Sequence, residues 1–428
     1  MPITLREGST LPEKPPVRYT IGKLICNGAQ SDAYEAYVGT DVTESNKVFL
    51  KACLAPTPIV PWFNSYLDYV KKINLVAEKA DVSAFCVLAR EVFAMNPDPG
   101  FLDSEFLYQV FDFIEGGHDL RTLLDKGLGA FSWKDRVIVA RIFMYSISRL
   151  HEANIVHCDL KPENIQMLPN PGSGLPWIPR LIDMDRSILS NERAPWDRYE
   201  GYVGTIGYMS PEHISGKIPS KASDIFTCAL ILFEVLSGIH PYQSVKAEPE
   251  DYKKAVLNEQ HTFKKKPCKL LGVNDIESVT HEKIVRVLLQ ALSCDASCRP
   301  TARDIFDVLV EIPQEDIGHD QSTDEDKPSS FILKLKGDKG DKRVFIPTSY
   351  GRVFLSEISS DAIYASSEQF IISKDETGWH IETTSHCKNK TMLNEEIITQ
   401  KTLLKHGDRL CLVGASGNRA MNIEVILE

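Results

Sequence analysis

The pattern of hydrophobic and polar positions divides the chain into two parts. From residue 19 to about residue 312, strand-like apolar runs come first, and helical patterns follow at 119–125 and 132–151. From residue 331 onward, short β-type runs alternate with turn residues such as Gly407 and Asp408. Many short strands at this spacing predict a β-sandwich or barrel. The runs lie at 331–333, 344–346, 370–372, 379–381, 409–413 and 423–425.

Two polar segments lie outside these parts. Residues 1–18 are rich in proline and predict an arm that is disordered or lightly docked. Residues 313–330 are acidic, with Ile317 as their only large apolar residue, and cannot bury enough surface to fold. We therefore expect an arm (1–18), a domain of mixed helices and strands (19–312), a linker (313–330) and an all-β domain (331–428).

Composition and charge narrow the class of protein. The hydrophobic fraction of 43% and the charged fraction of 25% are typical of a soluble globular protein. The net charge of −11 opposes binding to nucleic acid or to a membrane surface, and we expect neither partner. No apolar run reaches the length of a membrane span, and the N-terminus lacks the apolar segment of a secretion signal. The ten cysteines form no C-x-x-C pair, which favours reduced thiols and a cytoplasmic location.

Residues 157–164 carry the strongest chemical signal, reading His-Cys-Asp-Leu-Lys-Pro-Glu-Asn. Asp159, Lys161 and Asn164 supply a carboxylate, an ammonium and a carboxamide, the groups that phosphoryl transfer needs. The segment resembles the catalytic loop of eukaryotic-type protein kinases, with one departure at Cys158. The resemblance implies that Asp159 orients the substrate hydroxyl, Lys161 steadies the γ-phosphate of ATP and Asn164 binds Mg²⁺. Lys161 at this position is the form found in serine/threonine kinases.

The nucleotide-binding residues of the resemblance lie upstream of this loop. Lys51 matches the lysine that contacts the α- and β-phosphates, and Ala33 faces the adenine slot. Gly28 is the only glycine left of the family pattern G-x-G-x-x-G. A helical stripe makes Glu91 the preferred partner of Lys51, with Glu78 as the rival.

A long insertion separates Lys51 from Glu91. It contains several aromatic residues, which predict either a docking surface or padding of the small lobe, and we favour padding. The aromatic residues are Trp62, Phe63, Tyr66 and Tyr69.

Two further kinase segments follow in order. Backbone groups of Asp112 to Ile114 are expected to bind the adenine edge, with Phe111 behind the pocket. Asp183 matches the aspartate of the D-F-G motif and is expected to bind Mg²⁺, a cation that prefers hard oxygen ligands. Asp185 replaces the glycine of that motif, which removes a hinge.

The resemblance also covers the end of the activation segment. Glu212 is expected to form a buried ion pair with Arg299, and Asp224 is expected to hold the catalytic-loop backbone. Cys158 replaces an arginine that normally pairs with a phosphorylated activation segment. We therefore expect that glutamate substitutions at residues of the activation segment that carry hydroxyl groups do not raise activity. These hydroxyls belong to Ser187, Ser190 and Thr205.

The β-rich part carries polar residues at positions expected in loops. They are Arg352 after Gly351, Ser366, Ser367 and Asn389. These residues, with the segment 404–410, resemble the phosphothreonine-binding loops of a forkhead-associated (FHA) domain. The resemblance implies that Arg352 and Ser366 bind phosphate and that Asn389 holds the peptide backbone. Gln369 replaces the usual histidine, which mainly shapes the loop. The replacement therefore bears on the rigidity of the loop more than on the contact with the phosphopeptide.

Together these residues predict an α+β, bilobal kinase-like domain followed by an all-β, FHA-like sandwich. The expected function is a serine/threonine protein kinase that transfers the γ-phosphate of ATP to protein hydroxyls and binds proteins containing phosphothreonine. A pseudokinase scaffold remains the alternative, because the glycine loop is degraded and Asp185 is unusual.

The linker adds a hypothesis of self-association. Thr323, once phosphorylated, is expected to bind Arg352 of another copy, and the alternative is that Thr323 belongs to a solvated acidic linker.

Overall fold

The computed structural model describes most of the chain. The described residues are 5–12, 17–28, 31–96, 105–126, 133–169, 177–202, 204–264, 278–312, 333–344, 348–356, 358–366, 369–375, 378–384, 387–414 and 418–427. The expected linker at 313–330 and its Thr323 therefore lie outside the described residues. No helix within the described ranges is long and apolar enough to cross a membrane.

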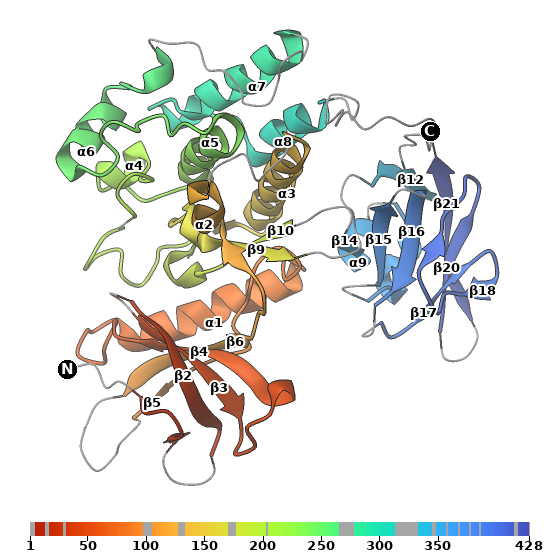
Figure 1. The fold of residues 1–428 in the computed structure, drawn as a ribbon, viewed down its shortest axis with the longest axis horizontal. Helices are drawn as coiled ribbons and strands as arrows, with labels where there is room; N and C mark the ends of the chain where they lie inside the picture. The colour runs from red at the N-terminus through yellow and green to blue at the C-terminus, as the bar shows by residue number, and fades with distance from the viewer. Residues whose placement is uncertain are drawn as a thin grey trace.

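The small lobe is a six-stranded antiparallel sheet with one long helix, α1 (Phe63–Lys79), against it (Figure 1). The strand order is β1-β2-β3-β4-β6-β5. Leu11 in β1 is buried in the apolar cluster of this sheet, so part of the expected N-terminal arm docks onto the lobe. The strands are β1 (Thr10–Leu11), β2 (Tyr19–Asn27), β3 (Ser31–Val38), β4 (Lys47–Cys53), β5 (Glu91–Met95) and β6 (Phe106–Asp112).

The strand register brings three site residues into one row. Ala33 in β3 pairs with Lys51 in β4, and Lys51 pairs with Gln109 in β6. Paired residues of neighbouring strands lie on the same face of a sheet. The next row on that face contains Phe49 and Phe111, whose ring centroids are 6.1 Å apart.

The large lobe is built around helix α5 (Lys221–Ser237), which is buried from Ser223 to its end. An apolar helix surrounded by other elements is the expected result of a sequence that is hydrophobic on all sides. The other helices of the large lobe are α2 (Leu120–Asp125), α3 (Trp133–Glu152), α4 (Pro211–Ile214), α6 (Pro249–Leu257), α7 (Ser278–Ala291) and α8 (Ala302–Val310). Short strands accompany them: β7 (His118–Asp119), β8 (Ile155–Val156), β9 (Ile165–Pro169), β10 (Trp177–Leu181) and β11 (Ile188–Leu189).

A buried ion pair fixes the end of the activation segment to this lobe. Arg299 Nη2 lies 2.9 Å from Glu212 Oε1, and the Arg299 side chain is fully buried. Arg299 Nη1 donates a second hydrogen bond to Glu212 Oε2 at 3.1 Å. The expected Glu212–Arg299 pair is present in the structure.

The C-terminal part forms two antiparallel sheets around their own apolar cluster. One sheet has the order β13-β12-β21-β20-β17-β18, and the other has the order β14-β15-β16-β19. The strands are β12 (Leu333–Gly337), β13 (Gly340–Arg343), β14 (Thr348–Tyr350), β15 (Phe370–Asp375), β16 (Gly378–Thr383), β17 (Lys390–Leu393), β18 (Glu396–Ile397), β19 (Thr402–Leu403), β20 (Arg409–Val413) and β21 (Arg419–Leu427). A short helix, α9 (Arg352–Ser356), follows β14.

Candidate active site between the lobes

The catalytic-loop residues converge on one carboxylate. Asp159 Oδ1 accepts a hydrogen bond from Thr205 Oγ1 at 2.7 Å, and Lys161 Nζ donates to the same hydroxyl at 3.2 Å. Lys161 Nζ lies 3.6 Å from Asp159 Oδ2. Asn164 Nδ2 donates to the backbone oxygen of Asp159 at 2.8 Å. The structure therefore brings together the three residues predicted from this loop and adds Thr205.

A buried carboxylate beneath this loop holds its backbone. Asp224 accepts hydrogen bonds from the backbone nitrogens of His157 at 2.8 Å and Cys158 at 3.0 Å. Its third contact is His151 Nε2, at 3.0 Å. Burial acts to raise the pKa of Asp224, but its hydrogen bonds and electrostatic contacts with His151 and His157 lower it overall. Asp224 thus remains a charged acceptor that fixes the loop, as expected.

Cys158 cannot act on a phosphate in the way an arginine would. Its side chain is buried, and burial, together with the nearby carboxylates of Asp224 and Asp159, raises the pKa of its thiol well above the ordinary value. A buried neutral thiol is inert and offers no donor to an activation-segment phosphate.

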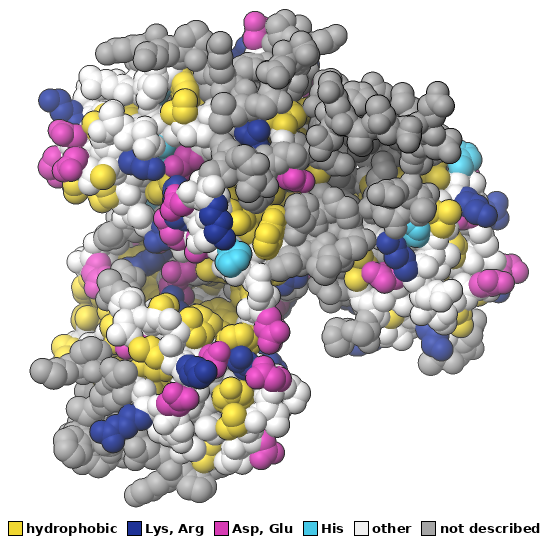
Figure 2. Space-filling model, viewed as in Figure 1, with side chains coloured by type: hydrophobic (Ala, Val, Ile, Leu, Met, Phe, Trp, Pro, Cys, Tyr) yellow, Lys and Arg dark blue, Asp and Glu magenta, His cyan; other side chains and the backbone are white. Residues whose placement is uncertain are grey.

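Lys51 contacts two carboxylates in the cleft between the lobes. Its Nζ lies 2.7 Å from Asp183 Oδ1 and 2.6 Å from Asp185 Oδ2. Burial acts to lower the pKa of Lys51, but the charges of Asp185 and Asp183 outweigh burial and raise it. Figure 2 shows hydrophobic side chains, with acidic and basic ones among them, where the two lobes meet.

The prediction that a helical Glu91 pairs with Lys51 is wrong. Glu91 begins strand β5 and accepts a hydrogen bond from Tyr19 Oη at 2.5 Å, with Arg18 as its ion-pair partner. The apolar residues near Glu91 belong to a strand, so the helical periodicity expected for this segment was assigned wrongly. The rival, Glu78, is exposed near the end of α1.

The remaining nucleotide-binding predictions fall on the sheet and the segment between the lobes. Ala33 is buried beside Lys51 in the register of the sheet. Asp112 ends β6 and pairs with Arg90 at 3.1 Å, and Ile114 follows in an irregular segment. A Cβ atom at Gly28 would lie 2.7 Å from the backbone oxygen of Ser31, so this glycine allows a close turn.

An aromatic cluster attaches the activation segment to α1. Trp196 is buried, and its ring lies 5.5 Å from that of Tyr66, 5.7 Å from that of Tyr69 and 6.4 Å from that of Trp62. Three of the aromatic residues of the insertion therefore pack inside the protein, which favours padding over a docking surface. Tyr69 Oη also accepts a hydrogen bond from the backbone nitrogen of Leu189 at 2.8 Å.

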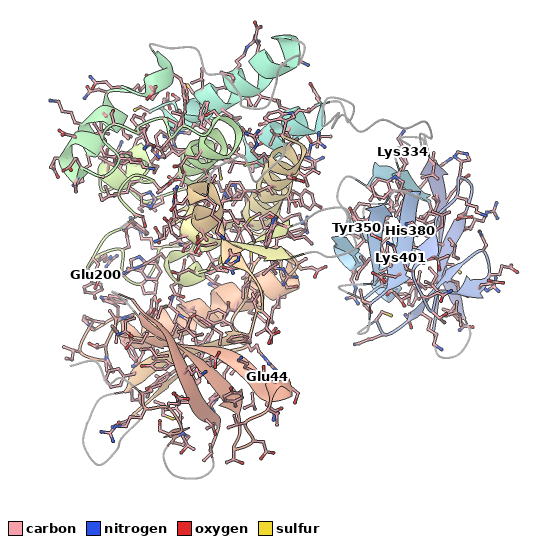
Figure 3. All side chains as sticks on the ribbon, in the orientation of Figure 1. Glu44, Glu200, Lys334, Tyr350, His380 and Lys401 are labelled. Carbon is pink, nitrogen blue, oxygen red and sulfur yellow. The ribbon has the colours of Figure 1, made fainter. Side chains whose placement is uncertain are left out.

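The three hydroxyls considered for regulation occupy different environments. Ser187 is fully buried and donates to the backbone oxygen of His157 at 3.3 Å. Thr205 bonds to Asp159, and Ser190 is exposed. The same segment contains Glu200, labelled in Figure 3, which lies 3.7 Å from Arg186. Among these hydroxyls, only Ser190 offers a surface position for a phosphate.

The structure brings the phosphopeptide candidates of the C-terminal part into one network. Arg352 begins α9 after Tyr350, which is labelled in Figure 3, and Arg352 Nε donates to the backbone oxygen of Ala365 at 2.9 Å. The backbone nitrogen of Lys388 donates to Ser366 Oγ at 2.9 Å. Ser367 lies outside the described residues.

Gln369 connects these loops from within. It is fully buried, accepts a hydrogen bond from the backbone nitrogen of Ser366 at 2.9 Å and donates to the backbone oxygen of Asn389 at 2.6 Å. Asn389 Nδ2 in turn donates to the backbone oxygen of Tyr364 at 2.7 Å. The glutamine at the usual histidine position thus ties Ser366 to Asn389 by direct hydrogen bonds.

Sequence reasoning missed Thr205 as a partner of Asp159 and Gln109 as a partner of Asp185. Gln109 Nε2 donates to Asp185 Oδ1 at 2.8 Å, from the middle of strand β6. Gln109 is a polar residue within a buried apolar strand, and that mismatch was the available signal. Thr205 had no comparable signal, because its contact depends on how the activation segment folds back onto the loop.

The two lobes and the site between them define a bilobal domain, and comparison with known proteins identifies its family. The protein kinase domain family matches residues 95–309, half of the chain. The chain belongs to the protein kinase family. This match begins after β4, so Lys51 lies outside it.

Curated relatives agree with this family. The chain is 35% identical over 148 residues to the serine/threonine-protein kinase AtPK2/AtPK19 of Arabidopsis thaliana, covering 33% of this chain and 28% of the relative. It is 32% identical over 159 residues to a calcium/calmodulin-dependent protein kinase type II of Caenorhabditis elegans, covering 35% and 21% of the two chains. A calcium and calcium/calmodulin-dependent serine/threonine-protein kinase of Pisum sativum is 28% identical over 230 residues, covering 51% and 40%. The chain thus spans less than half the length of these relatives.

Proposed function

We propose that this chain is an ATP-dependent serine/threonine protein kinase. The observation that carries the proposal is the cluster of Asp159, Asn164, Lys161 and Thr205, described above. A hydroxyl substrate near Asp159 would meet a carboxylate acceptor and a neighbouring ammonium, which are the groups that phosphoryl transfer uses. The named serine/threonine kinases among the relatives support the same reaction.

The residues of the cleft fit ATP and Mg²⁺ by their chemistry. Asp183 offers a carboxylate that is more exposed than that of Asp185, at 38% against 16%. The amide nitrogen of Asn164 bonds to the backbone of Asp159, which makes its amide oxygen the group for a metal. Oxygen ligands of this kind suit Mg²⁺. We propose that Asp183 and Asn164 hold the metal and that Lys51 holds the phosphates.

The roles of the other residues follow from their positions. Asp159 would accept the proton of the substrate hydroxyl, and Thr205 fixes the orientation of its carboxylate. Lys161 would neutralise the phosphate during transfer. When bound, ATP and Mg²⁺ supply the phosphoryl group and part of the neutralising charge. Ala33 and the backbone of Asp112 to Ile114 would bind the adenine.

One incubation tests the kinase proposal. Wild-type protein and the Asp159→Ala variant are incubated with γ-labelled ATP, Mg²⁺ and a mixture of protein substrates. The proposal expects label on serine or threonine with wild type and a loss of at least about a hundredfold with the variant. Equal labelling by both proteins would contradict the proposal.

A pseudokinase scaffold is the second candidate, and one observation favours it. Lys51, the residue proposed to hold phosphates, has two carboxylate partners, Asp183 and Asp185. A scaffold would retain this arrangement without transfer. The absence of label from wild-type protein that still binds partners would select this candidate.

We also propose that the C-terminal domain is an FHA-like reader of phosphothreonine. Support comes from the two-sheet architecture and from the network that joins Ser366, Gln369 and Asn389 beside the exposed Arg352. An exposed guanidinium suits bidentate binding of a phosphate. Titration calorimetry with a phosphothreonine peptide and its unphosphorylated form tests the proposal. Equal affinity for the two peptides would overturn it.

Partners and location remain part of the proposal. Protein substrates and phosphothreonine-containing proteins are the expected partners, and self-association would use phosphorylated Thr323. The nine cysteines in the described part of the chain are all free thiols, which supports a cytoplasmic location.

A further inference from the structure

Helix α1 offers no buried carboxylate to the lysine of the cleft. All residues of α1 are described, and its two acidic residues, Asp68 and Glu78, are exposed. The face of α1 that packs inward is apolar and aromatic instead. Its buried residues are Phe63, Tyr66, Tyr69, Val70, Ile73 and Ala77. The counter-charge for Lys51 must therefore come from another element.

Asp185 supplies that charge from the segment after β10. Lys51 Nζ lies 2.6 Å from Asp185 Oδ2, and Gln109 Nε2 donates to Asp185 Oδ1 at 2.8 Å. Both carboxylate oxygens thus have a partner. The backbone of Asp185 is held as well, because its oxygen accepts a hydrogen bond from Tyr66 Oη at 3.2 Å.

The two carboxylates beside Lys51 differ in their freedom to serve another group. The Asp183 side chain is 38% exposed, whereas the Asp185 side chain is 16% exposed. A charge held by two donors in a partly buried position stays in place when its neighbour is drawn to a metal. Asp183 can therefore turn to Mg²⁺ while Asp185 keeps Lys51 aligned.

We propose that Asp185 is the positioning residue for Lys51, held in place by Gln109 and Tyr66. This inference rests on the proposed kinase function and deepens it. It means that the alignment of Lys51 is coupled to the segment carrying Asp183, and that α1 contributes through a tyrosine hydroxyl instead of a carboxylate. At Asp185, movement of α1 breaks only the hydrogen bond from Tyr66 and leaves the Lys51–Asp185 ion pair intact.

The test compares Asp185→Asn with the wild type and with a matched control, Asp68→Asn. Asparagine keeps the size of the side chain and an acceptor for Gln109 but removes the charge. Asp68 is an exposed acid on α1, so its substitution removes one negative charge from that helix and serves as the control. Steady-state kinetics should show kcat lowered about tenfold in Asp185→Asn, with the KM for ATP changed by less than about threefold. Asp68→Asn should match the wild type.

A second readout does not depend on phosphoryl transfer. Lys51 is labelled with an amine-reactive ester in buffer without nucleotide or Mg²⁺, and mass spectrometry follows the rate. This rate reports how firmly the carboxylates hold the Lys51 amine. Asp185→Asn should be labelled about tenfold faster, since the Lys51 amine loses one of the two carboxylates that hold it away from the reagent. Tyr66→Phe, which removes one hydroxyl, serves as a second variant and should lower kcat by a smaller factor.

The outcomes separate this inference from the proposed function. Unchanged labelling of Lys51 in Asp185→Asn overturns the inference, whether or not the protein transfers phosphate. Faster labelling with a kcat within twofold of wild type also overturns it, because Asp185 would then hold Lys51 without serving the reaction. A wild-type protein without transfer contradicts the kinase proposal, and the labelling comparison still decides whether Asp185 positions Lys51.

Discussion

At the scale of single residues, the cleft depends on polar contacts between segments that are distant in the sequence. Thr205 bonds to Asp159, and Asp185 bonds to Lys51 and Gln109. Each contact fixes the direction of a charged group that would otherwise rotate freely in water. The consequence is that small substitutions at these positions should change catalysis more than stability.

Thr205→Val should lower kcat about a hundredfold, because Asp159 loses the donor that orients its carboxylate. Thr205→Ser keeps the hydroxyl and should remain near wild type. Thr205→Glu would place a second carboxylate beside Asp159 and should also reduce activity. Initial rates with a protein substrate measure all three variants, and a fully active valine variant would contradict this role.

Asp183→Asn should abolish Mg²⁺-dependent transfer, with a loss of about a hundredfold or more, while the fold stays intact. The residue lies in a short segment and is the more exposed of the two carboxylates at Lys51. Activity is measured across a series of Mg²⁺ concentrations, with circular dichroism as the control for folding. Near-normal transfer at any Mg²⁺ concentration would show that Asp183 is not the metal ligand.

At the scale of elements, the activation segment is attached to the protein by packing. Trp196 packs among three aromatic residues of the insertion and α1, and Lys72 of α1 pairs with Glu192 at 2.6 Å. Cys158 beneath it is buried and neutral.

These contacts order the segment without a phosphate, so we expect Ser190→Glu to leave activity unchanged. A several-fold gain would contradict this account.

Trp196→Ala should destabilise the kinase domain by about 3–5 kcal/mol, the usual cost of removing a buried aromatic side chain. Denaturant unfolding followed by tryptophan fluorescence measures the change. Tyr199→Ala, at an exposed aromatic position of the same segment, is the matched control and should cost little. Equal stability of the two variants would show that the aromatic cluster does not hold the segment.

The ion pair between Glu212 and Arg299 should make stability depend on pH. Burial acts to raise the pKa of Glu212, but Arg299 outweighs burial and lowers it below the ordinary value of 4.5. A lowered carboxyl pKa contributes stability that is present above pH 4.5 and is lost as the pH falls through the lower folded value.

The Glu212→Gln variant tests this dependence. It leaves Arg299 buried without its partner and should cost about 3–5 kcal/mol at neutral pH. Thermal melting of both proteins at a series of pH values should show the wild type falling more steeply below pH 4.5. Parallel curves would contradict the contribution of this pair.

The elements were predictable where the hydrophobic pattern was regular. The helices expected at 119–125 and 132–151 correspond to α2 and α3, and the apolar runs at 370–372 and 379–381 lie in β15 and β16. Glu91 was assigned to a helix because a short apolar run fits the periodicity of a helix as well as that of a strand. In the structure the segment forms strand β5, which pairs with β6. The Lys51–Asp185 pair could not be predicted, since it depends on the side-chain direction of a residue that replaces a glycine.

At the scale of the whole molecule, the chain combines a kinase domain and a β-rich domain with separate apolar clusters. Separate cores predict that a surface substitution in one domain leaves the other intact. Arg352→Ala should therefore abolish binding of a phosphothreonine peptide and leave kinase turnover unchanged. Calorimetry and initial rates on the same preparation measure both properties, and loss of turnover would contradict the independence of the two domains.

We propose that Asp159 and its partners support the transfer of phosphate to protein hydroxyls. The most direct measurement is mass spectrometry of phosphorylated residues after incubation with ATP and Mg²⁺, using wild type and Asp159→Asn prepared in parallel. The account predicts phosphoserine and phosphothreonine with wild type only. Wild-type protein that yields no more phosphorylated residues than Asp159→Asn would contradict it.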